Sequence, residues 1–450
     1  FDGKYFSEFN FGYNGSERFA KNERFGFFPS FGLGWYTSKE NFMKPLSGVL
    51  SKLKFKATYG LVGNDQIGSS DDRFFYISQV NLNNGAMGAP FGQEFGNYIN
   101  GVSINRYANN QITWEKAEML NLGVEIGLID QIEIQADYFT ETRTNILMDR
   151  AQVPSTMGLQ APTRANVGKA SSNGFEVTLD YNQDFSNDLF IGARANFSFA
   201  DSKYELYEEL DYTSAGLPWR SRIGLNLSQP FGYIAERLFI DEADVANSPL
   251  QTFGEYMAGD IKYKDINGDG IIDINDEVPI GYPTTPKIIY GFGMSSSYKN
   301  FDLSFFFQGS AQSSFFIDAY NSSPFIDTYG GAIGNNALLT AWANDYWSEN
   351  DRNLYASWPR LSDQVIDNNN RNSTWWLRDG TFLRLKSLEI GYSFNADILK
   401  KVKLKNARIY LTGTNLLTIS RFKIWDVEMG GNGLGYPIQK TTNIGINLNF

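Results

Sequence analysis

The chain has 450 residues, with no cysteine and no histidine, and its 39 Lys and Arg against 50 Asp and Glu give a formal net charge of −11. This composition excludes disulfides, thiolate or histidine metal sites and His-dependent triads, and an acidic chain without a basic stripe argues against a nucleic-acid partner. Aromatic residues are abundant, with 36 Phe, 25 Tyr and 9 Trp. No stretch reaches the roughly 20 apolar residues of a membrane helix, and no signal peptide is recognised at the start.

Segments that alternate apolar and polar residues follow one another along the chain, and this period of two predicts amphipathic β-strands. The first four begin near Tyr5, Phe27, Leu53 and Met119. Segments 131–148, 174–184 and 189–200 follow, then strands near Leu225 and Ile288, segments 301–310 and 388–394, a strand near Ile409 and the last segment, 441–450. The series predicts about 12 or 13 strands, many of them at or above the roughly 9 to 11 residues that cross a bilayer at a tilt.

Each of the clearest segments has one apolar side and one polar side. The apolar sides carry Ile132, Ile134, Ala136 and Tyr138; Phe175, Val177, Leu179 and Tyr181; Ile191, Ala193, Ala195, Phe197 and Phe199; Phe301, Leu303, Phe305 and Phe307; Leu388, Ile390, Tyr392 and Phe394; and Ile444, Ile446, Leu448 and Phe450. The polar sides carry full charges in mid-strand, among them Asp137, Asp180, Arg194 and Glu389. A membrane barrel has such strands, but a soluble sandwich with one wetted face has them too, so both interpretations stay open here.

The connections alternate between tight turns and long loops. Turns of about two to five residues join several neighbouring strands, whereas long loops are expected near 64–112, 146–170, 240–285 and 312–380. Short turns on one rim and long loops on the other are typical of outer-membrane barrels, which favours a transmembrane antiparallel β-barrel over a tandem of soluble β-sandwiches. The terminal aromatic residue, Phe450, then fits a barrel-assembly signal for the outer-membrane insertion machinery.

The stretch "DINGDGIIDINDE" (265–277) has the spacing of a calcium loop within a long loop at 260–280. Glycine at position 6 allows a sharp turn, and alternate residues supply the hard oxygens that Ca²⁺ prefers. The expected ligands are Asp265, Asn267, Asp269, the carbonyl of Ile271, Asp273 and Asp276. The last position is Asp rather than the usual Glu, with Glu277 as a neighbouring substitute. We expect a structural ion, calcium in preference to magnesium; an Asx-rich turn without an ion is the alternative.

Other motifs are weaker. "GGNGLG" (430–435) is not placed between a strand and a helix, which argues against a phosphate loop. Scattered carboxylates resemble a glycosidase pair only by coincidence, so no catalytic residue is assigned and the chain is not expected to be an enzyme. Four loop tryptophans are candidates for stacking on a sugar or anchoring a partner, with loop packing as the alternative: Trp219, Trp358, Trp375 and Trp376.

Several phrases resemble the SusC/RagA-like TonB-dependent transporters of the outer membrane. They are "FFPSFGLGW" (27–35), "LKFKATYGLVGN" (53–64), "GDIKYKDINGDGIIDINDEVPIGYPTTPKIIYGFG" (259–293), "YKNFDLSFFFQGS" (298–310), "DGTFLRLKSLEIGYSF" (379–394), "ARIYLTGTNLLT" (407–418) and "YPIQKTTNIGINLNF" (436–450). These phrases occur in order over nearly all of residues 1–450. The resemblance implies the C-terminal portion of a 22-stranded barrel in a Gram-negative outer membrane, whose plug and early strands lie outside this sequence.

For function, the resemblance implies TonB-energised import of large nutrients, oligosaccharides or in some members peptides. It also implies a SusD-like surface lipoprotein as a lid, the TonB complex acting through the plug, and outer-membrane lipid around the wall. The alternative from another class is a secreted, calcium-stabilised adhesin or carbohydrate-binding β-sandwich protein. An outer-membrane hydrolase and an ungated porin are less favoured.

Overall fold

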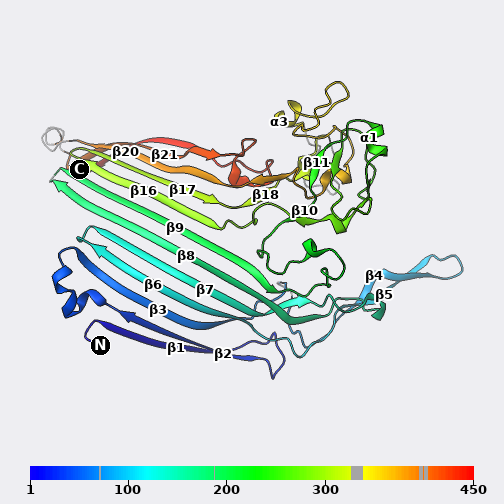
Figure 1. Cartoon of the computed structure of the whole chain (residues 1–450), viewed down its shortest axis with the longest axis horizontal. Coiled ribbons are helices and arrows are strands. Elements are labelled where there is room, and N and C mark those ends of the chain that lie inside the picture. Colours follow the sequence, from blue (N-terminus) through cyan, green and yellow to red (C-terminus); the bar gives the residue numbers. More distant parts are fainter. Residues whose placement is uncertain (70–71, 187, 326–337, 395–398, 400–403, 450) are drawn as a thin grey trace.

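One large antiparallel sheet dominates the structure, a computed structural model that describes the chain except for residues 70–71, 187, 326–337, 395–398, 400–403 and 450. The sheet has 12 strands, in the order β1-β2-β3-β6-β7-β8-β9-β16-β17-β20-β21-β22 (Figure 1). They are β1 (Tyr5–Gly15), β2 (Phe25–Trp35), β3 (Leu50–Asn64), β6 (Glu115–Leu128), β7 (Ile132–Asp149), β8 (Arg164–Ser186), β9 (Leu189–Leu206), β16 (Ile288–Tyr298), β17 (Phe301–Ala311), β20 (Phe382–Ser393), β21 (Asn406–Ser420) and β22 (Thr441–Asn449). The antiparallel architecture and the strand number predicted from the sequence are confirmed.

Short turns and long connections alternate as predicted. Figure 1 shows tight connections at one end of the strands and the long ones at the other. The tight ones include residues 129–131 and 299–300, while the long ones include 65–114, 207–287 and 312–381. In the first turn Ile129 and Asp130 have φ angles of 50° and 56°, the left-handed conformation that a tight hairpin with right-handed twist requires.

Three details of the sequence prediction were wrong. No strand begins near Leu225; this residue lies in an irregular segment whose carbonyl accepts a hydrogen bond from the backbone N–H of Tyr204 on β9. The connection expected at 146–170 covers only 150–163, because β7 and β8 continue well beyond the neighbouring strands. The connection at 64–112 contains a long hairpin of its own, β4 (Gln79–Phe91) with β5 (Asn97–Arg106).

Small elements build the long connections. The short strands are β10 (Phe231–Gly232), β11 (Ala235–Leu238), β12 (Leu250–Gln251), β13 (Ile261–Tyr263), β14 (Ile271–Ile272), β15 (Val278–Pro279), β18 (Ser314–Phe316) and β19 (Leu377–Asp379). The α-helices are α1 (Glu242–Ala246), α2 (Ala319–Ser322) and α3 (Thr340–Ala343). Short 3₁₀-helices lie at Thr37–Lys39, Asn41–Leu46, Ser155–Met157, Pro218–Arg220, Ile274–Asp276, Asp367–Asn370 and Val427–Met429. None of the helices in the described part of the chain is long and apolar enough to cross a membrane.

The pairing register gathers the alternating apolar rows of neighbouring strands on one continuous face. Across the middle of the sheet, Val124 lies opposite Ala136, Ala136 opposite Val177, Val177 opposite Phe197 and Phe197 opposite Tyr290. Because side chains alternate along a strand, the polar residues between them share the other face. The apolar and polar sides predicted from the sequence therefore describe the two faces of the whole sheet.

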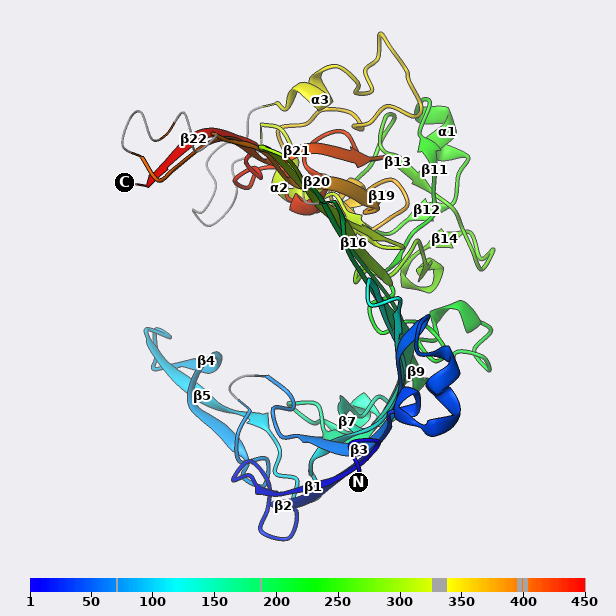
Figure 2. The ribbon, with the colours of Figure 1, turned by 90° about the vertical axis from the view of Figure 1, so that its left-hand side faces the viewer.

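The sheet curves, and its polar face is the concave one. Figure 2 shows the sheet as an open arc with the β4–β5 hairpin inside the curve. The segments that lead to this hairpin pack Phe75 and Ile112 into a buried cluster with Phe28. Phe28 and Ser30 point to the same side of β2, and Ser30 lies opposite Asn10 on the polar face. Phe25 and Phe27 point to the other side of the strand and are exposed. The segments over the concave side thus cover the polar face.

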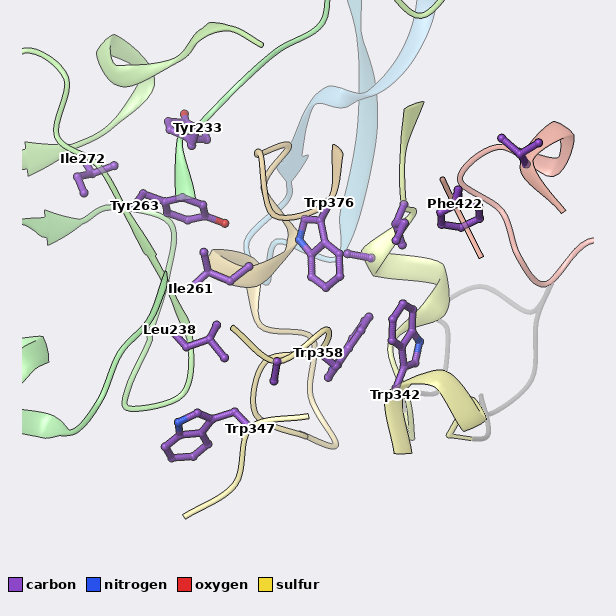
Figure 3. Close-up of a cluster of buried hydrophobic side chains, with 14 of the residues drawn as sticks. Tyr233, Leu238, Ile261, Tyr263, Ile272, Trp342, Trp347, Trp358, Trp376 and Phe422 are labelled. Carbon is purple, nitrogen blue, oxygen red and sulfur yellow. The ribbon is translucent and has the colours of Figure 1, made fainter. Parts of the chain in front are cut away.

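The largest core lies in the long connections rather than in the sheet. Figure 3 shows aromatic and aliphatic side chains from segments far apart in the sequence, packed around Trp358 and Trp376. By contrast, the apolar face of the sheet has no covering layer in the described chain: Phe9 and Ile446 are each 62% exposed. The candidate sites described below therefore lie either on the large sheet, whose apolar face is uncovered in the described chain, or in the packed layer of long connections at one end of it.

Candidate functional site

The concave face of the sheet carries charged side chains that pair across strands. Near the 129–131 turn, Lys52 Nζ lies 2.8 Å from Glu125 and 2.5 Å from Glu133, and Lys56 Nζ lies 3.2 Å from Glu125. Further along the sheet, Arg194 lies 2.5 Å from Asp180.

A third group joins Arg408 on β21 to Asp302 on β17 and to Glu389 on β20, the latter at 2.6 Å. All these groups lie within a few residues of the tight-turn end of their strands. Partly exposed ion pairs of this kind add little stability, because water and salt screen them. These charged groups make the concave face of the sheet hydrophilic, so this face suits contact with water and polar solutes.

The predicted tryptophan candidates lie in the loop layer at the opposite end. Trp358 and Trp376 are buried, 6% and 1% exposed, and their rings pack against each other with centroids 5.0 Å apart. Trp375 is partly buried against the same cluster. Trp219 is half-buried and its indole N–H donates to the carbonyl of Asn275 at 2.8 Å. These four side chains pack and tie the loops here, and their contact with a substrate stays a prediction.

A buried carboxylate joins two of the long connections in the same loop layer. Asp260 is fully buried, with Arg360 Nε at 2.9 Å and the Asn369 side-chain amide donating at 2.8 Å. Burial raises the pKa of Asp260 above its ordinary value, and the nearby Arg360 opposes this shift. Nothing in the sequence pattern indicated this junction, because Asp260 lies about 100 positions before Arg360 and Asn369 and only the fold brings them together.

The 265–277 stretch forms a compact loop in which the carboxylates accept hydrogen bonds from the loop's own backbone. The Asp265 side chain accepts from the N–H groups of Gly268 and Gly270 at 2.7 and 2.8 Å. Asp269 accepts from Ile271 N–H at 2.8 Å. Gly268 and Gly270 have φ angles of 75° and 83°, so glycine serves the sharp turns as predicted.

The last two expected ligands of the motif, Asp273 and Asp276, cap the short 3₁₀ turn Ile274–Asp276 reciprocally. Asp276 is fully buried, and its carboxylate accepts from the N–H groups of Ile266 and Asp273 at 2.7 and 2.9 Å. Among the described residues, no three acidic side chains are gathered closely enough to hold a metal ion. Calcium binding by this loop stays a prediction, and we derive no step of the function from it.

The predicted assembly signal, Phe450, lies outside the described residues. The strand that leads to it, β22, pairs with β21 in register, so that Ile444 lies opposite Leu411 and Ile446 opposite Ile409. The ion pairs of the concave wall were visible in the sequence only as charges in mid-strand; which charges meet depends on the register.

Comparison with known proteins shows that the chain is similar to TonB-dependent receptors. No family model matches it. A TonB-dependent receptor of Formosa agariphila is 27% identical over 482 residues, covering 99% of this chain and 44% of the relative. SusC of Bacteroides thetaiotaomicron, a TonB-dependent receptor, is 27% identical over 468 residues, covering 99% of this chain and 42% of the relative. The chain therefore spans less than half the length of these curated relatives.

Solved structures give the same fold. The RagAB peptide importer in the closed-closed state aligns with a TM-score of 0.69 at 23% identity, covering 100% of this chain and 46% of that one. The open-open state aligns with a TM-score of 0.69 at 24% identity. The resemblance to SusC/RagA-like transporters and the outer-membrane barrel fold inferred from it are thereby confirmed. The matched relatives are receptors and transporters rather than enzymes, in agreement with the sequence analysis.

Proposed function

We propose that this chain forms wall and outer loops of an active importer for large nutrients, oligosaccharides or peptides, in the outer membrane. The observation that carries the proposal is the register of the sheet, which separates a continuous apolar face from a concave face with paired charges. An apolar outer face is stable in hydrocarbon, and a concave polar face lets a hydrated solute pass.

The resemblance to SusC supports a proposal for the partners of the importer. We propose a SusD-like lipoprotein as a lid over the long-loop end, and energy from the TonB complex acting on a plug domain outside these 450 residues. The barrel-assembly machinery would insert the wall. The RagAB complexes are described as peptide importers, which supports peptides as one of the two substrate classes.

Transport would proceed from the loop end to the turn end. The lid opens, a substrate enters between the long loops, the plug is displaced, and the solute leaves along the charged wall near the tight turns. In this scheme the loop core around Trp358 and Trp376 holds the mouth in shape, and the 265–277 loop, with calcium when bound, would stiffen it. The sheet itself only has to remain rigid and keep its concave face hydrated.

The second candidate is a secreted, calcium-stabilised adhesin or carbohydrate-binding sandwich. That function needs a second sheet packed on the apolar rows, because a soluble sandwich buries its inner faces. In the described chain these rows are bare, with Ile444 76% exposed and Phe9 62% exposed. The importer is therefore the better-supported function.

Single cysteines test the proposal directly, because these 450 residues contain none and add no background labelling. We would place them on the apolar face (Ala136→Cys and Val177→Cys) and, as matched neighbours, on the concave face (Gln135→Cys and Thr178→Cys). In outer-membrane vesicles the concave pair should react quickly with a small charged maleimide, and the apolar pair only with a lipid-soluble one. Equal labelling of both pairs by the charged reagent would overturn the importer.

A further inference from the structure

A cavity of about 340 Å³ lies at the loop end of β9, between the segment after this strand and the strand β15 region. Its lining combines rings and charged groups: Tyr207, Tyr212, Arg220, Arg222, Phe231 and Glu277. A volume of this size is at the lower end of the range for small-molecule sites, enough for a ligand of about two amino-acid residues.

The walls of the cavity are fixed to the barrel. The segment that follows β9 folds back on it, so that Tyr204 N–H donates to Leu225 and Gly224 N–H donates to Tyr204. Arg150, just after β7, holds Glu208 at 2.8 Å. A cavity between segments held in this way is largely formed before a ligand arrives, which lowers the entropic cost of binding.

Two guanidinium groups in the cavity lie on aromatic rings instead of on carboxylates. Arg222 lies 4.6 Å from the centre of the Phe231 ring and 5.9 Å from that of Tyr207, and Arg220 lies 5.2 Å from that of Tyr212. Within the described chain, neither side chain forms an ion pair or donates a hydrogen bond to an acid. The rings thus orient the planar guanidinium groups, and the N–H donors of these groups remain free to bind a carboxylate through two parallel hydrogen bonds.

The carboxylates of the cavity differ in what they already bind. Glu208 is paired with Arg150. Glu209 accepts from the Ser221 hydroxyl at 2.5 Å and from Arg222 N–H at 2.9 Å. The Glu277 carboxylate, half-buried, has no polar partner among the described residues. One negative group and two positive groups therefore face the cavity without partners.

We infer that this cavity binds the zwitterionic form of a short peptide, with its carboxylate on Arg220 and Arg222 and its ammonium group on Glu277. The rings of Tyr207, Tyr212 and Phe231 provide apolar surface for the peptide's side chains. The inference deepens the proposed import function and rests on it for its biological meaning, since it makes this cavity a peptide subsite at the mouth of the importer.

An acidic sugar is the competing ligand, and the charges disfavour it. A uronic acid would use the two guanidinium groups but would leave the half-buried Glu277 unpaired and close to a second negative charge. A neutral sugar would use neither the guanidinium groups nor Glu277, and covering these charged groups with a ligand that does not pair with them costs binding free energy. Only a ligand with both charges satisfies all three groups.

Calorimetric titration of the full chain in detergent with dialanine tests the inference. Dialanine should bind, and Arg222→Gln or Glu277→Gln should each weaken binding at least about tenfold. Arg352→Gln and Glu349→Gln, exposed loop positions outside the cavity, serve as matched controls and should bind as the natural chain does.

N-acetylated dialanine separates a direct contact from a folding effect. Acetylation removes the ammonium charge, so it should weaken binding to the natural chain about tenfold but should not weaken binding to Glu277→Gln any further. Absence of dialanine binding, equal affinities for all variants, or glucuronate binding that is independent of Glu277 would each overturn the inference. If one of these results occurs while the cysteine labelling still distinguishes the two faces, the peptide site is rejected and the proposed import function remains. If the labelling does not distinguish the faces but dialanine still binds, only the import function is rejected.

Discussion

Asp72 joins segments of the concave side that are far apart in the sequence. Its carboxylate lies 2.7 Å from Arg164 at the start of β8 and 3.2 Å from Arg106 at the end of β5. Burial opposes ionisation of this carboxyl group, but hydrogen bonds from Arg164 and Ser69 outweigh it and lower the pKa of Asp72 from 3.8 to about 2. The β4–β5 hairpin, which has only two strands and little stability of its own, depends on this junction.

Replacing Asp72 by Asn should release the hairpin. The amide keeps the shape but removes the charge that both arginines share, so residues 79–106 should exchange their amide hydrogens about tenfold faster. Hydrogen exchange with mass spectrometry measures this, with Asp363→Asn, an exposed loop position, as the control. Unchanged exchange in Asp72→Asn would show that the hairpin is held by its apolar contacts instead.

The same carboxyl group predicts a pH dependence. Because its pKa is lower in the folded loop, the junction stabilises the fold fully above about pH 4, and that contribution is lost as the pH falls towards about 2. Exchange of residues 79–106, corrected for the intrinsic rate, should therefore rise between these values in the natural chain. In Asp72→Asn this step should be absent.

The 265–277 loop gives a further residue-scale prediction, on metal binding. If the calcium spacing is functional, Ca²⁺ should bind the natural chain more tightly than Mg²⁺ does, because the loop offers oxygen ligands in an irregular array. Asp265→Asn should weaken Ca²⁺ binding at least about tenfold by titration calorimetry, and Asp363→Asn should not. Identical titrations for all three proteins would leave the loop as an Asx-rich turn closed by its own backbone.

At the scale of elements, the apolar face sets the cost of a charge. A cation on the lipid side of a barrel strand costs ~2–4 kcal/mol at the bilayer midplane and little near the interfaces, whereas a cation on the lumen side meets water. Ala136 and Gln135 are neighbours on β7 but face opposite sides. Ala136→Arg should lower the unfolding free energy of the barrel in lipid by an amount in that range, and Gln135→Arg should leave it nearly unchanged. Equal losses would contradict the assignment of the two faces.

The strands were predictable because their information is local. Alternation over ten or more residues fixes both the element and its face, so Ile132 to Tyr138 or Ile444 to Leu448 required no knowledge of distant residues. The strand expected near Leu225 failed for the opposite reason: its apolar residues belong to a segment that folds back on β9, and that placement depends on Tyr204, some twenty residues earlier.

The sites were harder to predict than the strands. The acids Asp273 and Asp276 have the spacing of metal ligands and equally that of a reciprocal helix cap, so the sequence alone does not distinguish the two roles. The tryptophans Trp358 and Trp376 look the same in sequence whether they bind sugar or pack a core. The partners of Asp72 and Asp260 are non-local, and no periodic pattern points to them.

At the scale of the whole molecule, the bare apolar face determines where the protein can exist. A sheet with rows of exposed Phe, Ile and Leu on one side is stable in lipid or detergent but aggregates in water. The importer therefore predicts that the chain sediments with the outer membrane, stays there after a high-salt wash, and is released only by detergent. A protein that is bound to the membrane only through surface charges would instead be released by the high-salt wash.

Peptide or glycan uptake by living cells completes the test at this scale. A strain that lacks the gene should lose uptake of one nutrient class, and the natural chain should restore it together with the rest of the transporter. Gln135→Arg, on the wet wall, should restore uptake, while Ala136→Arg should do so only weakly because less barrel assembles. Restoration by both variants in equal measure, with equal amounts in the membrane, would mean that the apolar rows do not face lipid.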